Sequence, residues 1–227
     1  MTKDLPALLI EIEDGLQWLR SNLPTHIEGM EVSSKSKIPY KALTCRAAFG
    51  WRFAELCRSA SEALQNERLV SGILLTRAAA ETCAGVWYLS TRLRRAVEEK
   101  SLGNADDRLM RLLCGNKSDA EMPDPVHVND FIAAVEKQAP GFQSQYDRLS
   151  EFAHPNWAGT LLSYSKSDPD ERCTFFGPYL RQAESIRVQG VVGLSIVLLM
   201  FRKVFNDVGD VMPAFTAVCE QQIGHAV

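Results

Sequence analysis

Residues 69–99 read LVSGILLTRAAAETCAGVWYLSTRLRRAVEE, a run that is rich in alanine and leucine and contains no proline. Alanine and leucine are strong helix formers, whereas proline would interrupt a helix. Residues spaced three or four apart form one stripe along this run: Ile73, Arg77, Ala80, Ala84 and Trp87. All of them except Arg77 are apolar. Such a stripe is typical of a helix that packs against others, so the sequence predicts a long helix over this run.

The same helical spacing continues on both sides of this run. Leucines and isoleucines within residues 5–19 predict a first helix that ends before Pro24. Residues 33–37, which are all serines and lysines, are expected to form a flexible connection. Further helices are predicted over residues 40–67, 106–113, 130–137 (capped by Asn129 or Asp130), 142–153 and 180–205, with a short tail helix beyond Pro213.

Strand-like alternation occurs in a single place. Residues 160–165 and 172–176 alternate and flank Ser167-Asp168-Pro169-Asp170, which has the composition of a turn. We therefore expect an all-α protein, an antiparallel helical bundle with one short β-hairpin insertion. Residues 1–227 are expected to form a single helical domain, with an N-terminal helix and linker over 1–38 and a core bundle over 40–205.

The composition limits the classes of function. A chain of 227 residues with 46% hydrophobic content can bury a core, and its net charge of -3 argues against a general nucleic-acid coat. A local cluster of basic residues is present nonetheless, and it is either a solvated helix end or a basic patch: Arg92, Arg94, Arg95, Lys100, Arg108 and Arg111.

Two further features bear on location and on cofactors. The longest apolar run, residues 191–201, is shorter than the ~20 residues that span a bilayer, so it predicts a buried helix and no membrane partner. The six cysteines show no metal-binding spacing and lie in apolar helical stretches. We interpret them as small core residues kept reduced in the cytoplasm, and we expect no metal and no cofactor.

Charged residues interrupt two of the apolar stripes. Glu81 follows Arg77 by one helical turn, so the two can pair on one helix face. Either they form a closed structural pair, or Glu81 pairs with Arg148 across helices, or the charges line a polar cleft shared with His154. Arg187 interrupts the stripe of the last helix, where it either extends to solvent or supplies a further cation.

The segment YDRLSEFAHPN, residues 146–156, carries the strongest functional pattern. Pro155 has no N–H and pushes the preceding residue out of the α region, so His154 is expected at a helix exit where its ring can face a cleft. Arg148 and His154 are six residues apart, which is about 120° around a helix. Their approach therefore requires either unwinding of the helix end or a twofold axis between two copies. Glu151 lies midway between them.

This spacing resembles the HEPN superfamily, whose mark is an Arg, four to six residues and then a His near a helix end in an α-helical bundle. The stretch LSEFAHPN, residues 149–156, is more particularly similar to a bacterial abortive-infection-type (AbiV-like) branch. That branch pairs the stretch with an upstream Arg-x3-Glu, here Arg77 and Glu81. The resemblance covers residues 40–205.

The resemblance implies a cytoplasmic homodimer that is a metal-independent endoribonuclease of a toxin–antitoxin or phage-defence system, acting with a cognate partner protein. His154 would be the general base or acid at the ribose 2′-OH, Arg148 would stabilise charge on the phosphate, and Glu151 would complete the site. The ligand-binding residues would be Arg77, Glu81, Asn156 and Arg187. Leu149 departs from the pattern, because active members commonly have a polar residue there.

Three interpretations remain open. The chain is an RNA-cleaving or RNA-binding protein, or a non-catalytic helical dimer that binds a nucleotide or a partner protein, or a dimeric bundle whose Arg–Glu–His cluster is a structural network. In the first case Arg148, Glu151 and His154 share one polar cleft, with Arg77 and Glu81 as its floor. A structural network should instead show His154 buried and fully hydrogen-bonded.

Overall fold

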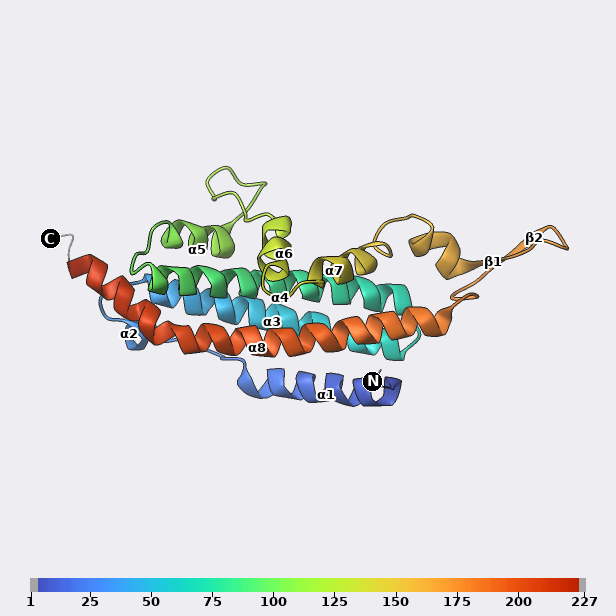
Figure 1. Ribbon diagram of the computed structural model, residues 1–227, viewed down its shortest axis with the longest axis horizontal. Coiled ribbons are helices and arrows are strands. Elements are labelled where there is room, and N and C mark those ends of the chain that lie inside the picture. The colour runs from blue at the N-terminus through green and yellow to red at the C-terminus, as the bar shows by residue number, and fades with distance from the viewer. Residues whose placement is uncertain (1–3, 225–227) are drawn as a thin grey trace. The chain divides into compact units, whose positions relative to one another are not determined.

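The computed structural model describes residues 4–224 and confirms an all-α fold with one short β-hairpin (Figure 1). Residues 1–3 and 225–227, which the predicted single domain includes, lie outside the described range. The three longest helices of the described residues are α3 (Ile38–Gln65), α4 (Leu69–Glu98) and α8 (Ala183–Gly224). The described residues divide into two compact units, and each long helix contributes one part to each unit.

The first unit comprises residues 4–20, 53–80 and 141–199. Besides its parts of the long helices it contains most of α1 (Leu5–Asn22), α7 (Phe142–Ser150), the π-helical turn η1 (Ala158–Leu162), β1 (Ser165–Asp168) and β2 (Cys173–Phe176). The two strands pair antiparallel, from Ser165 opposite Phe176 to Asp168 opposite Cys173.

Three helices of the first unit approach one another closely at a glycine of α8. A Cβ atom on Gly190 of α8 would lie 2.6 Å from the Leu64 side chain of α3 and 3.3 Å from that of Ile73 on α4. The three helices therefore meet where α8 has no side chain. On another side of α8, the Ser195 hydroxyl donates to the Glu11 carboxylate of α1 at 3.2 Å.

The second unit comprises residues 21–52, 81–140 and 200–224. It adds α2 (Gly29–Val32), α5 (Ala105–Cys114) and α6 (Val128–Glu136) to its parts of the long helices. Arg46 of α3 donates from Nε to the Phe205 carbonyl of α8 at 2.9 Å, and its guanidinium lies 3.6 Å above the Phe205 ring. Burial lowers the pKa of Arg46 to about 10, and the charge of Asp210 opposes that shift.

The first strand of the hairpin was predicted too early in the chain. Residues 160–164, expected to begin that strand, are instead helical: the Leu162 N–H donates to the Trp157 carbonyl at 2.9 Å, five residues back. Serine hydroxyls stabilise this turn, since Ser163 Oγ donates to the Ala158 carbonyl and Ser165 Oγ to the Leu161 carbonyl, each at 2.8 Å. The second strand lies where alternation predicts it.

The last helix is longer than the sequence suggests. It begins at Ala183 and continues without a break across Pro213, so the separate tail helix is wrong. A proline inside a helix costs about 3 kcal/mol, because it removes one hydrogen bond and crowds the preceding turn. Met212 and Phe215, on either side of Pro213, are buried in the second unit, and burial of each stabilises by about 1.5–3 kcal/mol. Together they offset the local cost.

Smaller differences concern the connections. Residues 33–37 form the expected connection, between α2 and α3, and Ser33 Oγ there accepts the Ser36 N–H at 3.0 Å and donates to Glu220 at 2.7 Å. His127, rather than Asn129 or Asp130, caps α6. α7 ends at Ser150, three residues earlier than predicted.

The interpretation of the cysteines as core residues holds for four of the six: Cys45, Cys57, Cys83 and Cys219 are buried, whereas Cys114 and Cys173 are half-buried. Burial raises the pKa of the Cys45 thiol to about 12. By length and composition alone, α4 and α8 are apolar enough to cross a membrane. Core helices of soluble proteins meet the same criterion, and 61% and 56% of the two apolar windows are buried.

Candidate functional site

The predicted site lies mainly in the first unit, where α4 holds α7 in place through Arg77. The guanidinium of Arg77 donates from Nε to the Ser150 hydroxyl at 2.9 Å and from a terminal nitrogen to the Tyr146 hydroxyl at 2.7 Å. It also lies 5.1 Å from the centre of the Tyr146 ring. Arg77 thus binds two residues that are one turn apart on α7, and it fixes the end of that helix.

The chain leaves α7 through a tight turn. The N–H of Phe152 donates to the Leu149 carbonyl at 3.3 Å, and that of Ala153 to the Ser150 carbonyl at 2.9 Å. The buried Phe152 side chain anchors this turn. Gly159 then passes against the His154 carbonyl so closely that a Cβ atom at that position would collide with it. The conformation of the turn therefore depends on the packing of Phe152 before Pro155 and of Gly159 after it, as well as on the proline itself.

Arg148 and His154 are both exposed side chains of the first unit. Arg148 donates to the Gln145 side chain at 2.7 Å, and its carbonyl accepts from Gln189 of α8 at 3.2 Å. The exposure of His154 contradicts the expectation for a purely structural network, in which its ring would be buried. Solvent and ligands can reach both side chains.

Glu151 and Asn156 interact with each other across the turn. The Asn156 amide nitrogen donates to a Glu151 carboxylate oxygen at 2.8 Å, and its oxygen accepts the Gly159 N–H at 3.1 Å. Asn156 therefore joins the end of α7 to the start of η1. The amide in turn orients the Glu151 carboxylate, which stays exposed.

Of the remaining predicted residues, Arg187 has a partner outside this turn and Glu81 belongs to the other unit. Arg187 of α8 forms an ion pair with Glu67, in the connection between α3 and α4. Glu81 is half-buried one turn after Arg77 but belongs to the second unit. The cleft with Arg77 and Glu81 as its floor therefore stays a prediction.

Sequence reasoning missed the partners that position the motif. Tyr146 and Ser150 lie within the motif segment, whereas Gln145 lies just before it and Gln189 lies on α8. Their signal was the helical spacing of Tyr146, Leu149 and Ser150, which places all three on the side of α7 that faces α4 and α8. A hydroxyl on such a face needs a buried partner, and Arg77 supplies it.

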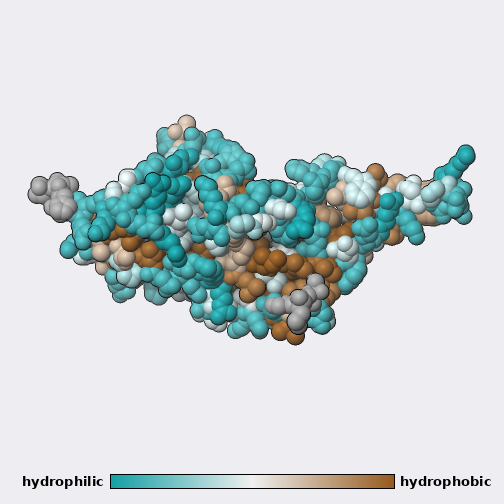
Figure 2. All heavy atoms as spheres, in the orientation of Figure 1, coloured by the Kyte–Doolittle hydropathy of each residue, from teal (hydrophilic) through white to brown (hydrophobic). Residues whose placement is uncertain are grey.

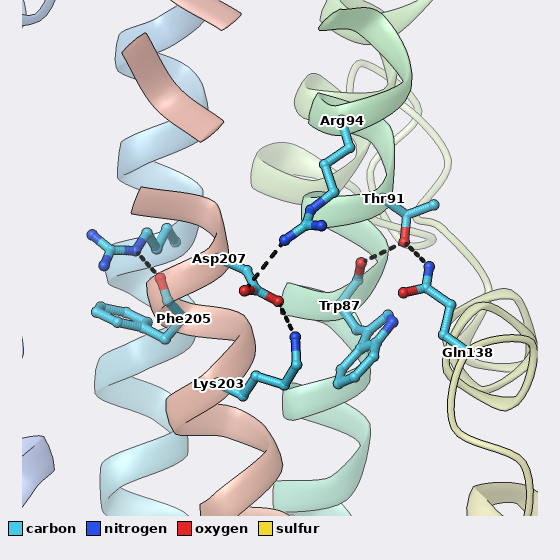
Figure 3. A network of polar contacts seen from close by, with 8 residues as sticks. Trp87, Thr91, Arg94, Gln138, Lys203, Phe205 and Asp207 are labelled. Carbon is cyan, nitrogen blue, oxygen red and sulfur yellow. Dashed lines mark hydrogen bonds and ion pairs between the residues drawn. The ribbon is translucent and has the colours of Figure 1, made fainter. Parts of the chain in front are cut away.

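In the second unit, the basic residues predicted at the end of α4 have separate environments. Arg94 forms an ion pair with Asp207 of α8 at 3.2 Å, and Lys203 binds the same carboxylate at 2.6 Å (Figure 3). Lys203 also lies 5.7 Å from the Trp87 ring. Asp207 thus neutralises part of the cluster. Arg92, Arg95 and Arg108 instead line cavities.

No group of three or more His, Cys, Asp or Glu side chains in the described part of the chain is arranged to hold a metal ion. A comparison of the chain with protein-family models, with curated proteins and with solved structures found no match.

Proposed function

We propose that this chain is a HEPN-like endoribonuclease of a bacterial defence or toxin type. The active form is a homodimer, in which His154 and Arg148 act on the RNA backbone. The observation that carries the proposal is the joint exposure of these two side chains beside one short, well-anchored turn. An acid–base group and a phosphate-binding cation must both be reachable by substrate, whereas the structural network considered above would have His154 buried and hydrogen-bonded.

The chemistry follows from these two residue types. One imidazole accepts the proton of a ribose 2′-OH, and that oxygen forms a bond to the adjacent phosphorus. The bond from phosphorus to the 5′-oxygen of the next nucleotide breaks, and this oxygen takes a proton from an acid. Arg148 stabilises the charge that grows on the non-bridging oxygens. The products are a 2′,3′-cyclic phosphate and a 5′-hydroxyl.

A second copy of the chain would supply the second acid–base group. One copy offers a single histidine at the motif, and the reaction needs a base and an acid. The first unit also exposes an apolar stripe on α8, formed by Val188 (38% exposed), Ile196 (39%) and Leu199 (57%). Residues 188–201 contain no charge, and Figure 2 shows hydrophobic surface over this helix. Such a stripe fits a symmetric contact between copies.

One observation favours the alternative, a non-catalytic module that binds a nucleotide or a protein. Leu149, which follows Arg148, is fully buried, whereas active members commonly have a polar residue there. In this case Arg148 and His154 would bind a ligand without cleaving it.

A cleavage assay separates the two functions. Purified full-length protein is incubated with fluorophore-labelled single-stranded RNA in the presence of EDTA, and products are resolved on a gel. We expect cleavage by the wild type and a loss of about 100-fold or more for His154→Ala, the usual contribution of an acid–base group. His26→Ala is the matched control, because His26 is also exposed but lies in the second unit.

The outcomes are distinct. If the wild type left the RNA intact throughout the neutral pH range, the endoribonuclease proposal would be overturned. The binding module would then be the remaining interpretation. Equal loss of activity in His154→Ala and His26→Ala would also contradict the assignment of His154.

A further inference from the structure

Two cavities in the second unit share three arginine side chains: Arg92 and Arg95 of α4, and Arg108 of α5. The first cavity measures about 480 Å³ and lies between the end of α4 and the loop that leads into α5. The second measures about 400 Å³ and lies between α4 and α6. The three guanidinium groups therefore stand where the two cavities adjoin.

The charge around these cavities is positive, although the whole chain is acidic. Among the described residues that line them, four are basic (Arg92, Arg95, Arg108 and Lys137) and two are acidic (Glu99 and Asp130). Glu99 already binds Arg95, at 2.8 Å. Arg92 and Arg108 form none of the ion pairs described for this unit, so their charges are available to an anion.

Three buried polar atoms at this place have no hydrogen-bond partner among the described residues: Nε of Arg92, Nε of Arg108 and the hydroxyl oxygen of Tyr88. Tyr88 is only 2% exposed, and its ring lies 4.6 Å from the Arg92 guanidinium. Buried polar atoms are nearly always paired, and an arginine cannot lose its proton to avoid the cost. The atoms that fit here are acceptors with negative charge.

We propose that this cluster binds a small phosphorylated molecule, with its phosphoryl group at Arg92, Arg95 and Arg108. A phosphate offers only acceptor oxygens, and the planar guanidinium matches its geometry with two parallel hydrogen bonds. Each cavity lies in the volume range of small-molecule sites, about 300–1,000 Å³, which is far larger than a bare phosphate. The remainder of the molecule therefore occupies one of the two cavities.

The second cavity has the lining that such a molecule needs. Small Ala133 and Ala134 side chains leave room beside α6, while Thr91 and Gln138 offer polar groups. The Gln138 amide donates to the Thr91 hydroxyl at 3.3 Å, a weak contact that a ligand can replace (Figure 3). The site uses none of the residues assigned to RNA cleavage, so it can be tested whether or not the proposed activity exists.

The test is titration calorimetry on the full-length protein with inorganic phosphate, pyrophosphate, ribose 5-phosphate and AMP, with ribose and a short single-stranded RNA as comparisons. We expect at least one phosphorylated small molecule to bind, and ribose not to bind. Arg92→Gln and Arg108→Gln should each weaken that binding about 10- to 100-fold, the effect of losing a charged hydrogen bond.

Arg94→Gln is the matched control, because it removes the same charge from the same helix outside both cavities. It should leave affinity within about twofold of the wild type, and circular dichroism checks that each variant is folded. The melting temperature of the wild type should also rise with the concentration of the bound phosphate compound.

Three results would overturn the site: no binding by any small phosphate compound, equal weakening by Arg94→Gln and Arg92→Gln, or binding of RNA alone. The last result would assign the arginines to a nucleic-acid backbone instead.

Discussion

At the scale of single residues, Arg77 and His154 have opposite environments. Arg77 makes two short hydrogen bonds to α7, whereas His154 is an exposed side chain on the turn that follows this helix. Replacement of Arg77 should therefore lower the stability of the fold, whereas replacement of His154 should lower the activity. This contrast separates a positioning residue from a residue that meets substrate.

Arg77→Ala should lower the free energy of unfolding by about 1.5–3 kcal/mol, because it leaves the Tyr146 and Ser150 hydroxyls without their charged donor. Arg77→Lys should recover only part of this, since one ammonium cannot reproduce the two directions of a guanidinium. Urea unfolding of both variants measures the difference. Arg58→Ala, an exposed arginine of the same unit, should change stability by less than about 0.5 kcal/mol.

At the scale of elements, the turn between α7 and η1 decides where the motif side chains lie. Its backbone is held by Phe152 in the core, by the Asn156 contacts and by the close passage of Gly159 past the His154 carbonyl. A substitution elsewhere in this turn should therefore displace the His154 side chain, although the histidine itself is unchanged.

Gly159→Ala tests this dependence. Its Cβ would collide with a backbone atom, which cannot rotate away, so we expect a loss of about 1–3 kcal/mol in stability and a loss of RNA cleavage. Gly193→Ala is the control, because its Cβ would meet the Gln145, Thr76 and Leu149 side chains at 3.4–3.5 Å, an ordinary contact. Unfolding curves and the cleavage assay are measured on both. Wild-type activity in Gly159→Ala would show that the turn is not needed in this form.

Periodicity predicted the long helices well because their apolar stripes are long. The ends of α3 and α4 fall within two residues of the prediction, since many buried positions repeat along each helix. Short segments were less predictable. Residues 160–164 alternate like a strand, yet serine hydroxyls and a five-residue backbone hydrogen bond favour η1.

The site was predictable only in its residue types. The sequence identified Arg148 and His154 by spacing, and both are exposed side chains close to the end of α7. It could not reveal that Arg77 binds Tyr146 and Ser150, because that contact depends on how α4 and α7 pack. Likewise, the basic residues near the end of α4 were visible as a cluster. Only packing separates Arg94, which binds Asp207, from Arg92, which lines a cavity.

At the scale of the whole molecule, the proposed reaction requires two copies of the chain. The apolar stripe of α8 is the surface proposed for their contact, and a charge placed there should prevent it. Leu199→Glu should convert a dimer into a monomer in multi-angle light scattering and should reduce RNA cleavage with it. Met30→Glu, which changes a still more exposed residue in the second unit, should leave the dimer intact. A wild-type protein that is monomeric at micromolar concentration would contradict the dimer.

The chemistry of the RNA ends tests the central proposal most directly. The wild-type protein is incubated with a single-stranded RNA of defined sequence, and the masses of the fragments are measured. Attack by a 2′-OH, assisted by His154, predicts fragments that end in a 2′,3′-cyclic phosphate and begin with a 5′-hydroxyl. The same RNA with 2′-O-methyl groups should remain intact. Fragments with a 3′-hydroxyl and a 5′-phosphate, or no fragments at all, would contradict the account.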